Sequence, residues 1–297
     1  MSDNNKPVVL ALGFFDSVHK GHQKVIDKAF LLAKEGGYEV AVFTFYGNLK
    51  KAIGNEEEKC VYTAEERKII LNSIGVENIF FAPTSREFLS MDKKTFLDFI
   101  NTKYEIKAYV TGKDYRFGKG GEGDVEYLKE YAKALSQKVL TVDTYIVDGE
   151  KVSSSLVKGF LKEGDIEKVN SLIGRNYSIT GKVARDRGVG TKLGFPTANV
   201  ELEEDKLTPK KAVYYGSVEI DGCMHGCIIN LGARPTFNLD KTALEVYILD
   251  FDGDLYDREI KINFEGYIRE IIKFERKEDL VSRLEKDKKF LIVRKVK

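Results

Sequence analysis

Residues 8–22 read VVLALGFFDSVHKGH, and this stretch decides the fold of the first half of the chain. The run Val8–Leu12 is continuously apolar, as expected of a strand buried on both faces of a parallel sheet. Apolar residues at helical spacing follow over Gln23–Lys34, and Gly36 and Gly37 stop that helix. A buried strand that leads through a turn into a helix predicts an α/β doubly wound domain.

The strand and helix signals continue to alternate until about residue 172. Thr63 and Glu66 form a T-x-x-E capping box for a helix that runs to about Ser73. The other expected strands are Glu39–Tyr46, Asn78–Ala82, Lys107–Thr111 and Val139–Val142, and the other expected helices are Lys93–Asn101, Val125–Ala134, Ser154–Lys162 and Ile166–Leu172. This rhythm places ligands at the carboxyl ends of the strands.

Beyond residue 172 the pattern becomes β-rich, with turns that contain glycine. We expect strands over Tyr177–Val183, Tyr214–Ile220, Cys227–Leu231, Glu245–Phe251 and Glu259–Phe264. An amphipathic helix follows near Lys277–Asp287, with Leu280, Val281 and Leu284 on its apolar face. The pattern predicts a C-terminal antiparallel β-barrel domain with a terminal helix, and domains of residues 1–172 and 173–297.

Composition narrows the possible partners and compartment. The 297 residues suffice for two domains of roughly 150 residues each. The 48 Lys and Arg and the 47 Asp and Glu leave a net charge of +1, so a nucleic-acid or membrane partner is disfavoured. Three cysteines fit a reducing compartment, and no apolar stretch approaches the ~20 residues that span a bilayer. We expect a soluble, cytoplasmic protein that is a monomer or weak homo-oligomer.

The turn after the first strand holds two of the three histidines, His19 and His22. Their ring N–H groups can bind phosphate oxygens, and the start of a helix favours an anion. Gly13 and Gly21 give the backbone room to approach a phosphate. In isolation such histidines are more often capping or surface residues, but their place between a buried strand and a helix favours a phosphate site. Metal binding is disfavoured because no third ligand lies nearby.

A second glycine-rich stretch runs from Gly188 to Asn199 and includes Gly190 and Gly194. It lacks the G-x-x-x-x-G-K-[ST] spacing of a P-loop. The glycines alone favour a hairpin slightly over a phosphate loop. Pro196, however, fixes the backbone just before Thr197 and Asn199, whose oxygens could hold Mg²⁺ and phosphate.

The cluster of Cys223, His225 and Cys227 suggests a metal site only weakly. The three side chains would share one face of a strand, but zinc prefers four ligands and no further candidate is near in sequence. A β-turn with small buried thiols is the preferred interpretation.

The H-x-G-H turn resembles the signature of the nucleotidyltransferase superfamily. The longer pattern resembles the adenylyltransferase half of bacterial bifunctional riboflavin kinase/FAD synthetases, with further blocks at 111–118 (TGKDYRFG) and 152–158 (VSSSLVK). The resemblance implies a Rossmann-like nucleotidyltransferase fold with His19 and His22 as catalytic residues. It also implies ATP or phosphate binding by Gly13, Phe15, Asp16, Gly21, Asp114, Arg116, Ser153, Ser154 and Lys158, and flavin binding by Phe117.

The string GFPTAN at 194–199 resembles the hallmark of riboflavin kinases, and similar blocks follow at 230–237 and 245–256. The resemblance therefore covers nearly the whole chain. It implies Glu245 as the general base toward riboflavin and Arg269 as a flavin contact. It also implies phosphate binding by Gly188, Gly190, Gly194, Thr197 and Asn199. Of these, Thr197 and Asn199 would also hold Mg²⁺.

The implied activity is ATP-dependent phosphorylation of riboflavin to FMN, followed by adenylylation of FMN to FAD with release of pyrophosphate. The implied small molecules are riboflavin, FMN, FAD, ATP and Mg²⁺. The chain departs from the family pattern at Ser17, Gly121, Lys158, Asp186, Thr191, Ala212 and Ile271. Two alternatives therefore stay open: that only one half is active, or that the chain is a non-catalytic flavin- or nucleotide-binding regulatory protein.

Overall fold

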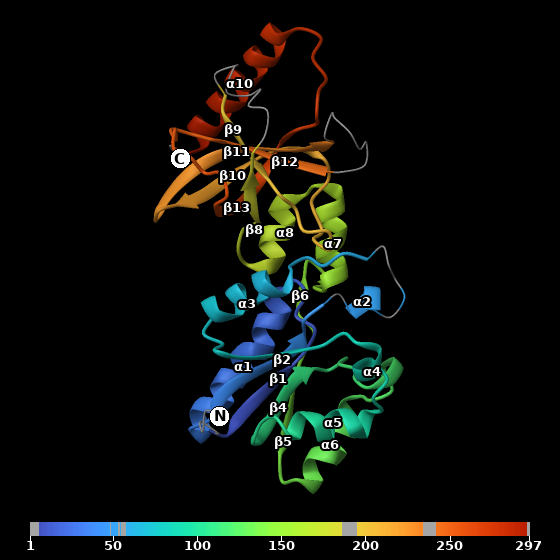
Figure 1. Ribbon diagram of the computed structural model, residues 1–297. Coiled ribbons are helices and arrows are strands. Elements are labelled where there is room, and N and C mark those ends of the chain that lie inside the picture. Colours follow the sequence, from blue (N-terminus) through green and yellow to red (C-terminus); the bar gives the residue numbers. More distant parts are fainter. Residues whose placement is uncertain are drawn as a thin grey trace. The chain divides into compact units, whose positions relative to one another are not determined.

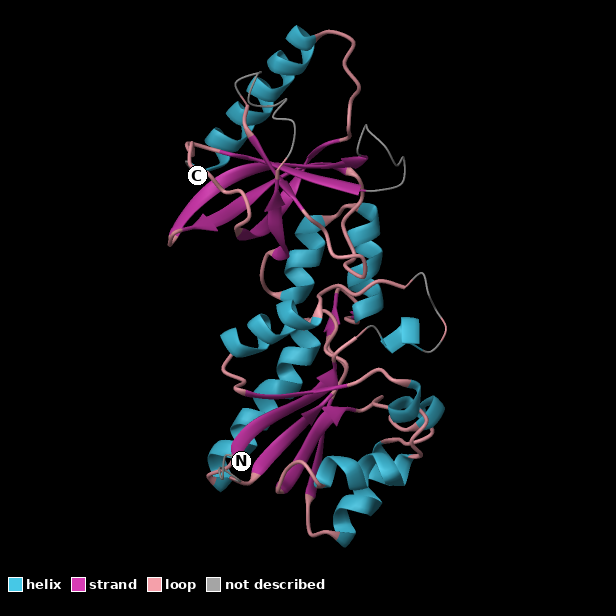
Figure 2. Cartoon of the chain, in the orientation of Figure 1, coloured by secondary structure: helices cyan, strands magenta, loops and turns pink. Residues whose placement is uncertain are grey.

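The computed structural model describes residues 6–47, 49–52, 54, 58–185, 195–233 and 242–295. The chain folds into two compact units, Met1–Leu156 (unit 1) and Val157–Lys297 (unit 2). Helices flank a sheet in unit 1, whereas strands dominate unit 2 (Figure 2).

Unit 1 is built on a five-stranded parallel sheet, as the sequence predicts. Its strands lie in the order β3-β2-β1-β4-β5. They are β1 (Val8–Leu12), β2 (Glu39–Phe45), β3 (Asn78–Ala82), β4 (Ile106–Gly112) and β5 (Lys138–Val142). All five residues of β1 are buried, which explains the continuous apolar run. The strand order reverses between β1 and β4, the point where doubly wound folds bind ligands.

Helices cover both faces of this sheet, with α1 and α3 on one side and α4, α5 and α6 on the other (Figure 1). The helical elements are α1 (Lys20–Gly36), α2 (Leu49–Ala52), α3 (Ala64–Ser73), α4 (Arg86–Leu89), α5 (Lys93–Asn101), the 3₁₀ turn η1 (Lys119–Gly121) and α6 (Val125–Ala134). Gly37 ends α1 in a left-handed conformation with φ 68°. The short α2, α4 and η1 were not predicted, because three or four residues show no periodicity.

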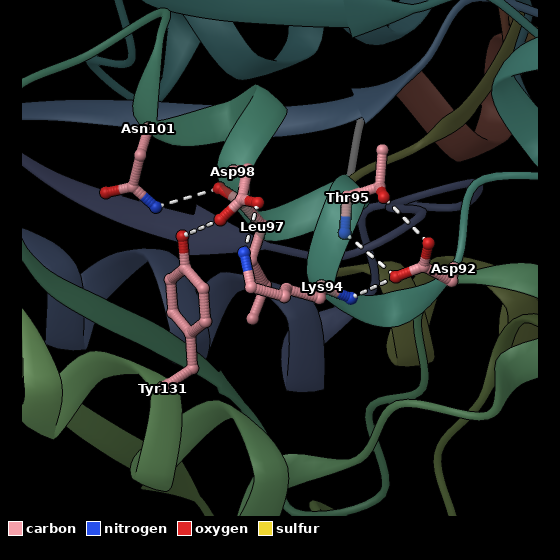
Figure 3. Close-up of polar contacts among 7 residues, drawn as sticks. All are labelled: Asp92, Lys94, Thr95, Leu97, Asp98, Asn101 and Tyr131. Atoms are coloured by element: carbon pink, nitrogen blue, oxygen red, sulfur yellow. Dashed lines mark hydrogen bonds and ion pairs between the residues drawn. The ribbon is translucent and has the colours of Figure 1, made fainter.

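Polar side chains fix the ends and the packing of these helices. The predicted capping box of α3 is present in both directions, between Thr63 and Glu66. Asp92 caps α5, and Asp98 in the same helix accepts hydrogen bonds from Lys94 and from the Tyr131 hydroxyl of α6 (Figure 3). The Asp98 carboxylate therefore joins α5 to α6.

A two-stranded hairpin, β6 (Ile146–Val147) and β7 (Glu150–Lys151), connects the sheet to the next helix. Asp148 and Gly149 form its turn, both with positive φ (51° and 81°). The hairpin leads directly into α7 (Ser154–Glu163), which starts at the end of unit 1 and continues into unit 2.

Unit 2 contains a closed antiparallel barrel, as expected, with the strand order β10-β11-β12-β9-β8-β13. The strands are β8 (Tyr177–Ala184), β9 (Thr197–Val200), β10 (Ala212–Ile220), β11 (Cys223–Ala233), β12 (Thr242–Ile248) and β13 (Glu259–Arg269). Strand β9 was not predicted, because its sequence TANV carries a weak β signal and its pairing with β12 and β8 defines it.

Two helices pack on this barrel. Helix α8 (Ile166–Ile173) lies against β13 and β8, and its Asn170 donates a hydrogen bond to the Phe264 carbonyl (2.9 Å). Helix α10 (Lys277–Lys295) lies against β11, where Leu291 joins a cluster of Val213, Tyr215, Ile228 and Leu249. The predicted apolar residues of α10 are half-buried, and its most buried described side chains are Asp287 and Leu291.

The predicted domain boundary at residue 172 differs from the boundary between the two units, because α8 packs on the barrel and belongs to unit 2. The boundary between catalytic domains stays a prediction. The interpretation of Cys223 as a buried turn residue is wrong: it is exposed and begins β11, whereas Cys227 is buried in that strand. In the described ranges, no helix combines the length and apolar character needed to cross a membrane.

Candidate active sites

A pocket of about 340 Å³ lies within unit 1 at the carboxyl ends of β1, β4 and β5. It gathers residues from the three sequence blocks that resemble nucleotidyltransferases. Its lining includes Gly13, Phe14, Phe15, His19, Gly21, His22, Phe45, Thr111, Gly112, Asp114, Tyr115, Arg116, Tyr145, Lys151, Ser153 and Ser154. A mixed polar and aromatic lining at the strand-order reversal suits a nucleotide.

The turn between β1 and α1 forms one wall of this pocket and has a strained backbone. Phe15 and Val18 adopt positive φ angles of 51° and 43°, which is rare for a β-branched residue such as Val18. The side-chain hydroxyl of Thr44 donates to the Phe14 carbonyl (2.6 Å) and holds the turn against β2. A Cβ at Gly13 would come within 2.8 Å of the Phe15 ring, so a side chain at this position would displace that ring.

The two predicted catalytic histidines lie together at the start of α1. His19 is the N-cap residue, and its Nδ1 accepts a hydrogen bond from the His22 backbone N–H (3.2 Å). The two rings stack with centroids 3.6 Å apart, and the Phe15 ring lies edge-on to His22 at 5.2 Å. The His19 ring also explains Gly21, because a Cβ there would approach it to 3.0 Å. The imidazoles are thus held in place at a helix start that favours anions.

Charged side chains line the pocket near the histidines. The Lys151 ammonium on β7 donates to the Asp114 carboxylate, which follows β4. This hydrogen bond is the main cause that lowers the pKa of Asp114, and His19 adds a smaller effect in the same direction. Arg116 also lines the pocket, and its mostly exposed side chain lies 3.7 Å from Asp124. A second carboxylate, Asp143, also lines the pocket, which therefore presents two cations and two carboxylates to a ligand.

The serine block brings the start of α7 to the same pocket. Ser153 accepts a hydrogen bond from the Leu156 N–H (3.2 Å) and so acts as a helix cap. The Ser154 hydroxyl lies 3.0 Å from the hydroxyl of the buried Ser17. The family pattern has glycine in place of Ser17. Lys158 follows four residues after Ser154 in α7 and is buried in the part of this helix that belongs to unit 2.

Besides Lys158, two predicted site residues do not line the pocket. Asp16 is buried, and its carboxylate accepts a hydrogen bond from the Val61 N–H (2.9 Å). Phe117 is buried in the core, where its ring stacks on Phe96 at 5.5 Å. Their contacts in the structure support the walls of the site.

In unit 2, the barrel register places three predicted kinase residues side by side. Glu245 on β12 pairs with Asn199 on β9, and Tyr247 pairs with Thr197. Because alternate residues of a strand share a face, Thr197, Asn199 and Glu245 present their side chains on one face of the barrel. All three are half-buried. Their oxygens form a short row that a phosphate or a cation could reach.

Asn230 extends this row on the other side of Glu245. It pairs with Glu245 in the β11–β12 register, and its Nδ2 donates to Glu245 Oε2 at 3.3 Å. The pocket next to the row, about 340 Å³, is lined by Pro196, Tyr247, Ile248, Asp250, Phe251 and Asp252. Glu245 is therefore held between two asparagines on neighbouring strands.

The remaining predicted residues of unit 2 are not part of this row. The side chain of Arg269 donates to the buried Asp287 of α10, with Nη2–Oδ2 at 2.7 Å, and its contacts join β13 to α10. Gly188, Gly190 and Gly194, as well as Arg234 and the rest of its block to Phe237, lie outside the described residues. Within the part of the chain that the structure describes, no group of three His, Cys, Asp or Glu side chains could hold a metal ion.

Sequence reasoning missed several residues around the two sites. Lys151, Thr111 and Tyr145 line the pocket of unit 1, and Asn230 contacts Glu245 in unit 2. Lys151 follows the turn of a hairpin too short for a strand pattern, so only its position just before the serine block could have indicated it. Asn230 lies in a quoted block, but its role depends on the strand register.

The fold and the two sites define a class of protein in which a doubly wound nucleotide-site unit is joined to a closed antiparallel barrel. Residues 1–156 match the family model described as FAD synthetase, and residues 173–293 match the one described as riboflavin kinase. The chain belongs to the family of bifunctional riboflavin kinase/FMN adenylyltransferases.

Relatives of that name are similar along almost their whole length. The Listeria monocytogenes protein is 34% identical over 96% of this chain and 91% of its own length, and the Bacillus subtilis protein is 33% identical over 94% and 90%. A crystal structure described as a macrolide-efflux protein from Streptococcus pneumoniae has a TM-score of 0.88 at 27% identity, covering 96% of this chain and 94% of that one. That description applies to the pneumococcal protein, and for this chain the comparison shows that the two proteins share a fold.

Proposed function

We propose that this chain is a bifunctional enzyme of flavin-cofactor biosynthesis. Its riboflavin kinase activity converts riboflavin and ATP to FMN and ADP, and its FMN adenylyltransferase activity converts FMN and a second ATP to FAD and pyrophosphate. Both matched family models and the names of the full-length relatives support this proposal. The barrel would carry the kinase step and the doubly wound unit the adenylyl step.

One observation carries the proposal furthest. Residues more than 130 positions apart, from His19 to Ser154, meet at a single pocket at the carboxyl ends of the parallel strands. The pocket contains histidines at a helix start, two cations and two carboxylates, which together suit a triphosphate and its ribose.

In the adenylyl step, a phosphate oxygen of FMN attacks the α-phosphorus of ATP. The new P–O bond forms as the bond to the β-phosphate oxygen breaks, and pyrophosphate leaves with that electron pair. His19 and His22 at the start of α1, together with Arg116 and Lys151, would stabilise the charge that develops on the phosphates. No covalent enzyme intermediate is needed, so catalysis consists of positioning and charge stabilisation.

In the kinase step, Glu245 would accept the proton of the riboflavin 5′-hydroxyl as its oxygen attacks the γ-phosphorus of ATP, and ADP leaves. The hydrogen bond from Asn230 to Glu245 Oε2 fixes the carboxylate, so that Oε1 is available to the substrate. Thr197 and Asn199 on the adjacent strand would bind the transferred phosphate.

The donor set of the barrel row fits Mg²⁺. Thr197 and Asn199 offer hydroxyl and amide oxygens, and Mg²⁺ is commonly held by one or two protein oxygens together with substrate phosphates. When bound there, Mg²⁺ neutralises phosphate charge.

We place Arg269 and Phe117 near the flavin, as the resemblance implies. The contact of Arg269 with Asp287 and that of Phe117 with Phe96 would support the walls of the two sites. The catalytic domains would be residues 1–172 and 173–297, and the expected location is the cytoplasm.

A time course of the purified protein with riboflavin, excess ATP and Mg²⁺ tests the proposal, with flavins separated by chromatography. We expect FMN to rise and then to be replaced by FAD. FMN as the final product, or FAD from an FMN-fed reaction alone, would show that one half has lost its activity. No new flavin from either substrate would contradict the proposal and favour a flavin-binding protein.

A further inference from the structure

Arg67 is a fully buried arginine next to the adenylyl-transfer pocket. It lies in α3, four residues after the N-cap Thr63, and has no exposed surface. It does not line the pocket itself. Burying a guanidinium is unfavourable unless its N–H groups are satisfied, so such a residue has a specific set of partners.

Those partners are a backbone carbonyl in the turn after β1, a backbone carbonyl at the end of β2, and a side-chain hydroxyl of β2. One terminal nitrogen, Nη1, donates to the Phe14 carbonyl (2.9 Å) and to the Thr44 hydroxyl (3.1 Å). The other, Nη2, donates to the Phe45 carbonyl (2.6 Å). The guanidinium also lies 5.2 Å from the centre of the Phe14 ring. Arg67 thus joins the turn after β1 to the end of β2 through α3.

Arg67 is buried close to the carboxylate of Asp16. Burial lowers the pKa of the guanidinium, while the carboxylate of Asp16 acts in the opposite direction. Asp16 belongs to the same turn as Phe14 and is itself buried. The turn that contains Phe14 and Asp16 therefore has Arg67 as a buried cationic neighbour, and its Phe14 and Phe15 line the pocket.

The carbonyl held by Arg67 determines how the turn presents its amide groups. The Phe14–Phe15 peptide bond is trans, so the Phe15 N–H points away from the side on which the Phe14 carbonyl meets Arg67. Phe14, Phe15 and Phe45 all line the pocket. Rotation of this peptide would change both the amide direction and the placement of the aromatic wall.

We propose that Arg67 is a positioning residue for adenylyl transfer: it holds the Phe14 and Phe45 carbonyls so that the turn keeps its phosphate-binding conformation. This inference rests on the proposed function of unit 1. A lysine cannot replace the guanidinium here, because its single ammonium cannot reach two strand ends with a planar fork.

The test compares Arg67→Lys and Arg67→Met with two controls. Thr63→Ala removes the cap of the same helix and so destabilises α3 without changing the guanidinium. Arg86→Lys makes the same chemical change at an exposed arginine in unit 1. For each variant, kcat and KM for ATP are measured in the FMN-to-FAD reaction, riboflavin-to-FMN turnover serves as an internal reference, and Tm is recorded.

We expect Arg67→Lys and Arg67→Met to lower kcat/KM for ATP in FAD formation at least about thirtyfold, because small displacements of a phosphate-binding backbone are costly. Thr63→Ala and Arg86→Lys should stay within about twofold of the parent, as should FMN formation in all variants. If Arg67→Lys retains normal kcat/KM, or Thr63→Ala loses as much at a matched loss of Tm, Arg67 is merely structural and the inference is overturned. A parent protein that makes no FAD from FMN would instead reject the proposed function.

Discussion

At the scale of single residues, the chemistry of unit 1 depends on side chains with two roles. His19 caps α1 through its Nδ1 and presents its ring to the pocket, whereas His22 contributes its stacked ring without capping. A substitution at His19 therefore mixes a loss of helix stability with a loss of chemistry. Asparagine separates the two, because it is also a good N-cap residue.

We predict that His22→Ala and His19→Asn each lower FAD formation from FMN at least about tenfold, while FMN formation from riboflavin survives. His19→Asn should melt close to the parent protein, and His19→Ala should melt lower because the cap is lost. Steady-state assays of both reactions and thermal melts check this. Equal loss of both activities in a well-folded variant would contradict the assignment of the histidines to one of two sites.

Lys151 and Asp114 provide a pH test at the same scale. Lys151 lowers the pKa of Asp114 below the ordinary aspartate pKa of about 3.9. The carboxyl is therefore ionised at any pH above that ordinary pKa, and it protonates only when the pH falls through its own, lower pKa. Removing Lys151 returns that pKa toward the ordinary value, still far below neutral pH.

Lys151→Ala should therefore lower FAD formation by the same factor, roughly tenfold, at pH 6 and at pH 8. The loss comes from the missing cation and not from protonation of Asp114. Lys107→Ala is the matched control, since Lys107 pairs with Glu105 and neither residue lines the pocket. A loss that grows between pH 8 and pH 6 would contradict this explanation.

At the scale of elements, an ion pair holds the terminal helix on the barrel. Asp287 of α10 is 1% exposed and lies between Arg269 of β13 and Arg283 of α10. The sequence predicted an amphipathic α10 from its apolar spacing, but a buried carboxylate on that helix has no signature in periodicity, because its partner is 18 residues away.

Asp287→Ala should destabilise unit 2 by about 3 kcal/mol, because it leaves Arg269 without its buried counter-charge. Hydrogen exchange of β13 and α10 peptides during urea unfolding measures the change. The double variant Arg269→Leu/Asp287→Leu should recover most of the stability. Unchanged exchange in Asp287→Ala would mean that the ion pair does not fix α10.

Elements with strong local signals were predictable, and those defined by their neighbours were not. The capping box of α3 and the apolar run of β1 identify themselves in the sequence. Strand β9 is a strand only through its pairing with β12 and β8, and Arg67 is buried only because two strand ends meet above it. Such tertiary effects override local propensity.

At the scale of the whole molecule, two units with different folds each contain a separate candidate site. Sequence blocks placed His19, Asp114 and Ser154 at one pocket and Thr197 and Glu245 at another place in the chain. They could not show that the Asp16 carboxylate accepts a hydrogen bond from the Val61 N–H, because that contact depends on how the loop before α3 packs. We predict that the two sites act independently, with one reaction in each unit.

Mixing two inactive variants tests that independence most directly. His22→Ala should convert riboflavin to FMN and form FAD at least about tenfold more slowly than the parent, and Glu245→Gln should leave riboflavin unchanged but convert FMN to FAD. With riboflavin, ATP and Mg²⁺, we predict that an equimolar mixture forms FAD at least about tenfold faster than either variant alone, as FMN released by one is used by the other. A mixture that forms FAD no faster than the variants alone would contradict the assignment of one reaction to each unit.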